Sequence, residues 1–401
     1  MSSDDLTALD PAAAEGIIEN LRYGIPPHGY ARHFTVGRSE ELERLRRSLG
    51  NAKPQKGAAL LVQANYGAGK SHLLQVVREM ALEAGYAVSL VVVNAQGGVR
   101  FNRMDTIMGA VCARIEVPGG NGAGIGQLFT VFENSPQETR STFEISGGGK
   151  WDYSEFLSSP GIYVALRAWV NSPTQSVHDL IEDWLTNLPE YRSQRSFLYQ
   201  RLVAALRPKF RDPRAEWQFY ADEVFAFHTG GHRNAWAAFA DFDLIARSSG
   251  LRGLILIFDE FEDVIQNLNR RDYKQEAFLN LFRFFAGERF PGMGYFAVTP
   301  EFVAKCKAEL MSRGVLDFDY GRFERLPTFE MSQIAERDFL ELATRVRFVH
   351  GVAFEWDAVN AIPDRQLSRL VDRLWSVETP ERVRLAIQGL IHALDNFLEG
   401  A

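Results

Sequence analysis

The residues best suited to chemistry lie between Leu60 and Leu74, where the sequence reads LLVQANYGAGKSHLL. An apolar run is followed by a glycine-rich segment, then by Lys70 and Ser71, and then by an amphipathic segment. This order predicts a buried strand, a tight turn and a helix whose first N–H groups converge on one point, which is an arrangement that binds phosphate. Lys70 would contact the β- and γ-phosphates of ATP, and the Ser71 hydroxyl would bind Mg²⁺.

The predicted contact with nucleotide is a continuous run of residues: Ala64, Asn65, Tyr66, Gly67, Ala68, Gly69, Lys70, Ser71 and His72. The run departs from the pattern G-x-x-x-x-G-K-[ST] at one place, because Ala64 stands where the first glycine is expected. Alanine is the smallest substitute for glycine, so we expect the loop to bind phosphate. The sequence does not predict how tightly it binds. The alternative interpretation is an ordinary glycine-rich turn with a solvated lysine.

A second stretch, LILIFDE from Leu254 to Glu260, ends in two carboxylates. Its apolar run predicts a strand that is buried on both faces, as in a parallel sheet. Ligands of open α/β sheets bind at the carboxyl ends of the strands. We therefore expect Asp259 to hold Mg²⁺ together with Ser71, and Glu260 to orient or deprotonate the attacking water. An acidic first turn of a helix is the alternative interpretation.

The composition is that of a globular protein, with 46% hydrophobic and 24% charged residues. No apolar run reaches the roughly 18 residues of a membrane span, and the acidic N-terminus has no apolar signal segment. With only Cys112 and Cys306, we expect a cytoplasmic protein without a disulfide and without contact to a membrane. The net charge of −7 argues against a protein that coats nucleic acid with its whole surface.

A chain of 401 residues is long for one core, so we expect several lobes. The boundaries that we predict are 1–50 for an N-terminal helical segment, 51–117 with 243–328 for the core, 118–242 for a mainly helical insertion and 329–401 for a C-terminal helical lid. Within the insertion, the stretch from Glu190 to Arg214 is rich in arginine. It predicts a local patch for double-stranded DNA or a protein partner, or alternatively a solvated helix face.

Two groups of polar residues follow the acidic strand. A predicted strand from Gly294 to Val298 ends at Thr299, whose side chain could contact the γ-phosphate beside Asp259. The next candidates are arginines in a loop-rich stretch: Arg313, Arg322 and Arg325. One of them could act as an arginine finger across a subunit boundary, which would require a homo-oligomer. Ordinary surface arginines are the alternative.

The last helix is predicted to start at Thr379-Pro380, because proline favours the first helical position. Arg382 and Arg384 lie in its first turns, where cations oppose the helix dipole. Their presence there suggests a negatively charged partner such as phosphate.

The segment F-T-V-G-R ahead of the glycine-rich loop, with Gly37 and Arg38, is similar to a segment of ORC-like AAA+ and STAND ATPases that packs near adenine. An ordinary turn and helix is the alternative. The remaining motifs are I-I-x-x-L-R-x-G-x-P-P at 17–27, G-A-G-K-S-H, R-G-L-I-L-I-F-D-E-F-E at 252–262, T-P-E at 299–301 and F-E-R-L-P-x-F at 323–329. In this order they resemble the P-loop family that supplies ATP-binding proteins to BREX-type phage-defence operons. The resemblance is specific around 59–74 and 250–301 and weak across 118–235.

The resemblance implies an α/β fold with a P-loop AAA+ type core, a parallel sheet, a helical insertion and a C-terminal helical lid. It also implies a sensor role for Thr299, a second sensor role for Arg382 or Arg384, a bacterial origin and partners among defence proteins. We therefore predict a Mg²⁺-dependent ATPase that acts as a nucleotide-controlled switch or assembly component. A STAND-like switch that recruits proteins without DNA, and an ORC-like loader that binds DNA, stay open as alternatives.

Overall fold

The computed structural model describes residues 8–50, 57–93, 99–142, 157–171, 174–187, 230–262, 268–312 and 319–400, together with the single residues 6, 227, 228, 264 and 314. The arginine-rich stretch from Glu190 to Arg214 and the finger candidate Arg313 lie outside the described residues.

A sheet of six strands forms the centre of the molecule, in the order β3-β2-β4-β5-β1-β6. The strands are β1 (Ala58–Gln63), β2 (Ala87–Val92), β3 (Ile115–Glu116), β4 (Leu254–Asp259), β5 (Met293–Val298) and β6 (Thr328–Glu330). All neighbours pair in parallel except β3, which is antiparallel to β2. The expected α/β class is confirmed, with a mixed rather than purely parallel sheet. The predicted strand Leu254–Glu260 is β4, which is buried throughout.

Alternate side chains of a strand point to opposite faces of the sheet, and apolar residues occupy both sets of positions. Helices therefore cover both faces of the sheet. On one face, Val62 and Ile257 pack with the buried stripe of α3 (Lys70–Glu83) and with α2 (Ser39–Gly50). On the other face, Phe258 and Phe296 stack with their ring centroids 4.9 Å apart. This second face is covered by α4 (Met104–Cys112), α11 (Arg233–Ser248) and α13 (Arg271–Ala286).

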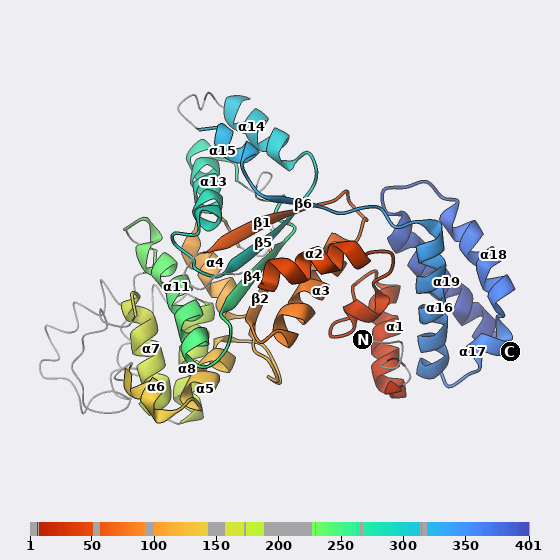
Figure 1. Ribbon diagram of the computed structural model, residues 1–401, viewed down its shortest axis with the longest axis horizontal. Coiled ribbons are helices and arrows are strands. Elements are labelled where there is room, and N and C mark those ends of the chain that lie inside the picture. Colours follow the sequence, from red (N-terminus) through yellow and green to blue (C-terminus); the bar gives the residue numbers. More distant parts are fainter. Residues whose placement is uncertain are drawn as a thin grey trace, which may run out of the picture.

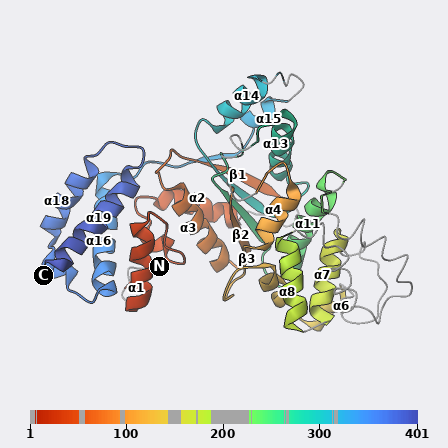
Figure 2. The ribbon, with the colours of Figure 1, turned by 180° about the vertical axis from the view of Figure 1, so that it is seen from behind.

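Helices from the predicted insertion extend the second face beyond the edge of the sheet (Figures 1 and 2). They are α5 (Ile125–Glu133), α6 (Gln137–Thr142), α7 (Pro160–Asn171) and α8 (Gln175–Thr186). Their buried side chains, such as Phe129 and Trp184, belong to the same apolar cluster as Phe258 of β4. The described part of this region therefore shares a continuous core with the sheet.

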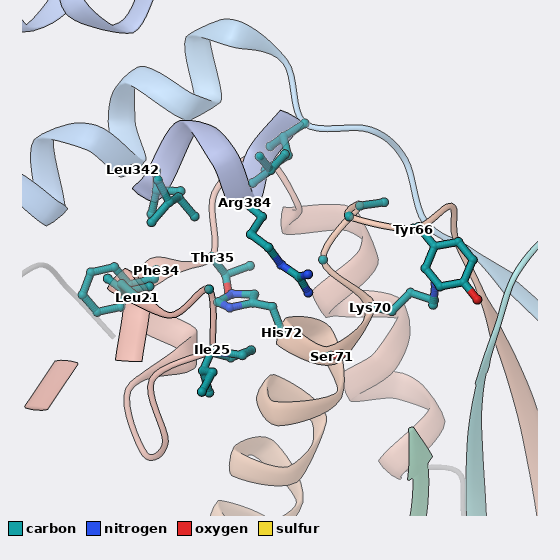
Figure 3. Close-up of a pocket in the computed structure, with 18 of the residues that line it drawn as sticks. Leu21, Ile25, Phe34, Thr35, Tyr66, Lys70, Ser71, His72, Leu342 and Arg384 are labelled. Atoms are coloured by element: carbon teal, nitrogen blue, oxygen red, sulfur yellow. The ribbon is translucent and has the colours of Figure 1, made fainter. Parts of the chain in front are cut away.

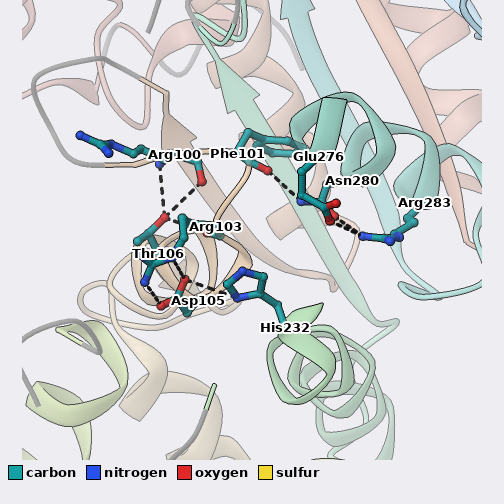
Figure 4. A network of polar contacts seen from close by, with 9 residues as sticks. All are labelled: Arg100, Phe101, Arg103, Asp105, Thr106, His232, Glu276, Asn280 and Arg283. Carbon is teal, nitrogen blue, oxygen red and sulfur yellow. Dashed lines mark hydrogen bonds and ion pairs between the residues drawn. The ribbon is translucent and has the colours of Figure 1, made fainter. Parts of the chain in front are cut away.

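Polar contacts also join the start of α4 to the start of α11 and the segment before α4 to α13 (Figure 4). Asp105, in the first turn of α4, is buried and accepts a hydrogen bond from Arg103 Nε at 2.9 Å. His232 Nδ1, from the short helix η7 (Gly230–His232) before α11, lies 3.6 Å from Asp105. Asn280 of α13 donates to the carbonyl of Phe101 at 2.9 Å. These contacts hold the segment after β2 and the start of α4 against α13 and the start of α11.

The C-terminal residues form a helical bundle to which the N-terminal helix belongs. Its helices are α16 (Glu336–Ala353), α17 (Ala358–Ala361), α18 (Asp364–Trp375), α19 (Arg382–Glu399) and α1 (Pro11–Arg22). The apolar stripe of α1, with Ile17 and Ile18, packs in one cluster with Val346 and Leu390. Arg22 on α1 donates two hydrogen bonds, of 2.6 and 3.2 Å, to Asp395 on α19. The first and last α-helices of the described residues therefore lie in one body, as Figure 1 shows.

Three further short elements complete the described structure: η2 (Ala31–Phe34), α14 (Phe302–Ser312) and α15 (Gly321–Glu324). Across the described part of the chain, none of the helices has the length and apolar character that a membrane crossing requires.

Candidate functional site

A cavity lies where the sheet meets the helical bundle, and four parts of the chain line it (Figure 3). These parts are the end of α1 with the segment that follows it, the glycine-rich loop with the start of α3, the end of β4 with the residues that follow it, and the bundle with α16 and α19. The glycine-rich loop contributes a continuous run from Tyr66 to His72. Most of the site predicted from sequence therefore surrounds one cavity.

The glycine-rich loop contains two residues in the left-handed backbone conformation, which glycine adopts without strain. It connects β1 to α3, and Gly67 and Gly69 have φ values of +72° and +91°. Gly69 is the N-cap of α3, so the first N–H groups of that helix lie at the cavity. A Cβ on Gly67 would come within 2.3 Å of the Pro380 carbonyl oxygen and 2.6 Å of Glu381 Cα. Glycine at position 67 thus permits direct contact between the loop and the start of α19.

Lys70 is buried and folds back onto the loop. Its Nζ donates to the carbonyl oxygens of Ala64 at 3.1 Å and Asn65 at 3.4 Å. It also lies 3.7 Å from Glu262 Oε1 and 4.8 Å from the ring centroid of Tyr66. Glu262 lines the cavity and was missed by the sequence reasoning. The available signal was its place two residues after Glu260 in the stretch DEFE.

Two carboxylates lie at the end of β4, at the predicted position, and both line the cavity with Ser71. Asp259 is buried, and its Oδ1 accepts a hydrogen bond of 2.9 Å from the Glu260 backbone N–H. Glu260 is exposed and has a φ of +53°, in the left-handed region that costs a residue with a Cβ free energy. Such strained backbone is concentrated at functional sites.

Thr299 directly follows β5, which lies between β1 and β4 in the sheet. The residue is buried, and its carbonyl oxygen accepts a hydrogen bond from the Phe302 N–H at 3.0 Å. Thr299 is not among the residues that line the cavity. It lies on the strand between the one that leads into the glycine-rich loop and the one that ends in Asp259.

The two arginines of α19 point in different directions. Arg384 lines the cavity, and in Figure 3 its guanidinium extends toward the side of Lys70 and His72. Arg382 does not line the cavity: its guanidinium lies 5.4 Å from the ring centroid of Trp375 and donates to the Val377 carbonyl at 3.2 Å. The arginine that the structure brings to the site is therefore Arg384.

The described finger candidates are engaged within the chain and away from this cavity. The Arg322 guanidinium lies 4.4 Å from the ring centroid of Phe282. Arg325 donates to Asp319 at 3.2 Å.

Of the predicted residues near the base, Arg38 lines the cavity and Gly37 does not. Arg38 is buried, donates to the Ala68 carbonyl of the loop at 3.0 Å and lies 3.7 Å from Glu41. Burial lowers the pKa of Arg38, and the neighbouring carboxylates of Glu41 and Asp338 oppose that shift. The guanidinium thus ties the segment before α2 to the glycine-rich loop.

His72 in the first turn of α3 ties the loop to η2. Its Nε2 lies 2.8 Å from the hydroxyl of Thr35, which directly follows η2. Burial, together with the positive charge of Arg38, lowers the pKa of His72 to about 4. The imidazole is therefore neutral at physiological pH and positions the segment without adding a charge to the cavity.

One end of the cavity is apolar, and the sequence reasoning did not identify the residues that form it. Its side chains come from both the N-terminal segment and the bundle: Leu21, Ile25, Phe34, Val36, Leu342, Val383 and Ile387. Ligand sites typically combine such an apolar surface with a few converging polar groups. Here the apolar end fits a planar base, and the end with Lys70 and the N-terminus of α3 fits an anion.

The oxygen donors at the polar end fit Mg²⁺. Magnesium is usually held by one or two carboxylates together with phosphate oxygens and water. Asp259 and the Ser71 hydroxyl line the same cavity and supply the protein part of such a set. No group of three or more His, Cys, Asp or Glu that could hold a metal by itself occurs among the described residues. The donors therefore suit a metal that arrives with a triphosphate.

A glycine-rich loop at a helix N-terminus, beside the carboxyl ends of parallel strands, is the site of a nucleotide-binding α/β protein. The chain belongs to the family described as BREX system ATP-binding protein BrxC/D, which matches residues 9–128 and 231–398. The match covers most of the chain, includes every residue that lines the cavity, and confirms the resemblance noted in the sequence. Membership implies ATP binding and a role in phage defence. Searches among curated proteins and solved structures gave no match.

Proposed function

We propose that this protein is a Mg²⁺-dependent ATPase of AAA+ type that acts as a nucleotide-controlled switch or assembly component in bacterial phage defence. The observation that carries the proposal is the composition of one cavity. The glycine-rich loop, the carboxylates at the end of β4 and Arg384 of the bundle surround the same space, next to an apolar surface. ATP would place its base on the apolar surface and its phosphates at the N-terminus of α3.

Roles in binding or hydrolysis then fall to Lys70, Ser71, Asp259, Glu260 and Thr299. Lys70 leaves the loop carbonyls and binds the β- and γ-phosphates, while Ser71 and Asp259 hold Mg²⁺, which neutralises charge on the phosphates. Glu260 orients or deprotonates the attacking water. Its exposed position at the cavity leaves room for that water. Thr299 acts as a sensor from the strand between the loop strand and β4.

Arg384 takes the second sensor role that the sequence assigned to Arg382 or Arg384. It belongs to α19, whereas Lys70 and Asp259 belong to the sheet and its helices. A γ-phosphate bound by both Lys70 and Arg384 would hold the bundle against the core, and its loss would weaken that contact. This difference between ATP and ADP is the physical basis of a switch.

The test measures ATP binding and phosphate release by the full chain with Lys70→Ala and Glu260→Gln. We expect Lys70→Ala to abolish binding, and Glu260→Gln to bind ATP but not hydrolyse it, because only the second change leaves the phosphate contacts intact. Lys305→Ala, which removes an exposed lysine of α14, is the matched control and should behave as wild type. Wild-type protein that binds no ATP would refute the proposal.

The same assay with double-stranded DNA separates the two rival outputs. Turnover that rises with DNA and falls with added salt would favour a DNA-acting assembly such as an ORC-like loader. Tight ATP binding with slow turnover, unchanged by DNA, would favour a STAND-like switch that recruits proteins. Mass measurement with and without ATP would show whether the protein forms a homo-oligomer.

A further inference from the structure

The ion pair between Lys70 and Glu262 points to a role for Glu262 that the functions of its neighbours do not include. Both side chains line the cavity, and they are 9% and 8% exposed. The lysine has two further partners in the Ala64 and Asn65 carbonyls, which lie in the loop itself. An ammonium has three donors and no acceptor. The two carbonyls take two of these donors, and at 3.7 Å the contact with Glu262 is an ion pair rather than a hydrogen bond.

Nucleotide binding must rearrange these contacts. A lysine that binds the β- and γ-phosphates directs at least two of its three donors to them, so it cannot keep both loop carbonyls. The ammonium must also move away from its present position beside Glu262. When Lys70 leaves the loop carbonyls, it exchanges uncharged acceptors for phosphate oxygens, and no pair of opposite charges is separated. Loss of Glu262 is different, because it separates two opposite charges in a largely buried place, where charge interactions are stronger than in water.

Glu262 also affects the free energy of the complex with bound nucleotide. Once Lys70 has moved to the phosphates, the Glu262 carboxylate lies in the same cavity as a highly charged anion, to which Asp259 and Glu260 add further carboxylates. Asp259 is offset by Mg²⁺ in the proposed function, whereas no such role is assigned to Glu262. Like charges at close range raise the free energy of the complex.

We propose that Glu262 is a positioning residue that competes with the terminal phosphate for Lys70 and thereby lowers the affinity for ATP more than the affinity for ADP. ADP lacks the γ-phosphate, so Lys70 can keep part of its interaction with Glu262 while it contacts the β-phosphate. The competition favours release of ATP and reduces the preference of the site for ATP over ADP. This inference rests on the proposed function, because it requires nucleotide phosphates at Lys70.

The experiment compares ATP and ADP affinities of wild-type protein and Glu262→Gln by calorimetry, in the presence of Mg²⁺. We expect Glu262→Gln to bind ATP about tenfold more tightly, equivalent to about 1.4 kcal/mol, and to gain clearly less for ADP. Glu301→Gln removes an exposed carboxylate after β5 that does not line the cavity. It is the matched control and should leave both affinities unchanged.

Two further variants separate the proposed role from a merely structural one. Glu262→Asp keeps the charge but shortens the side chain, so it should give an intermediate gain and serves if Glu262→Gln does not fold. In a Lys70→Arg background, the cation is retained with altered reach, and the gain from Glu262→Gln should change because the two residues act together. An identical gain in both backgrounds would overturn a role through Lys70.

The outcomes distinguish this inference from the proposed function. Glu262→Gln that binds ATP no more tightly than wild type, or gains equally for ATP and ADP, would overturn the competition while leaving ATP binding intact. If neither protein binds ATP, the proposed function fails and the inference with it.

Discussion

The contact between the glycine-rich loop and α19 gives a prediction with an internal control. Gly67 and Gly69 both have positive φ, so alanine at either position should cost about 1–2 kcal/mol of backbone strain. Only at position 67 would the added Cβ meet backbone atoms, at 2.3 Å from the Pro380 oxygen and 2.6 Å from Glu381 Cα. At position 69 the nearest atom is His72 Cβ at 3.9 Å, which is ordinary contact.

Gly67→Ala should therefore be more destabilising than Gly69→Ala, by about 1–3 kcal/mol of overpacking. Part of this cost can be relieved if the start of α19 moves away from the loop. We expect hydrogen exchange across residues 379–388 to be faster in nucleotide-free Gly67→Ala than in Gly69→Ala, and the urea midpoint to be lower. Equal exchange and equal midpoints in the two variants would refute the view that the bundle rests directly on the loop.

Three further predictions concern single side chains of the cavity. Arg384→Ala should weaken ATP binding about 10- to 100-fold in a nucleotide titration, because it removes a charged contact to phosphate, while Arg382→Ala on the other side of α19 should have little effect. Because the pKa of His72 is depressed to about 4, protonation of the unfolded chain lowers the free energy of unfolding as the pH falls from 6.5 to about 4. His72→Gln should therefore make the urea midpoint depend less on pH over this range. Glu260→Asn should abolish phosphate release yet raise the free energy of unfolding by up to about 1 kcal/mol, because asparagine tolerates the left-handed conformation. A lower unfolding free energy in that variant would contradict the strain at position 260.

Most parts of the site that could be predicted from the sequence consist of residues that are adjacent along the chain. The loop from Tyr66 to His72 and the pair at the end of β4 combine an apolar strand with adjacent polar residues, and local chemistry alone predicts their contact. The sequence could also place a polar side chain after β5, at Thr299. It could not show that β5 separates β1 from β4, because strand order depends on the whole fold.

The apolar residues that were missed depend on packing between distant segments, whereas Glu262 had a local signal. The apolar stripe of α1, with Ile17 and Ile18, predicts a helix but does not tell which surface covers it. The structure shows that α16 and α19 do, and this packing brings the N-terminal segment to the cavity. The choice of Arg384 had a usable signal, because it lies three positions before Ile387 and shares a helix face with it.

The membership of α1 in the C-terminal bundle limits how that bundle can move. Because the bundle contains the first and the last helix of the described chain, it is joined to the core by two covalent connections, one after Arg22 and one after β6. The first is further anchored, since Glu79 of α3 accepts hydrogen bonds from the Ala31 and Arg32 N–H groups, at 2.8 and 3.0 Å. A body held at two points can turn about the line between them but cannot swing freely. We therefore expect a change at the nucleotide to turn the bundle against the core rather than to release it.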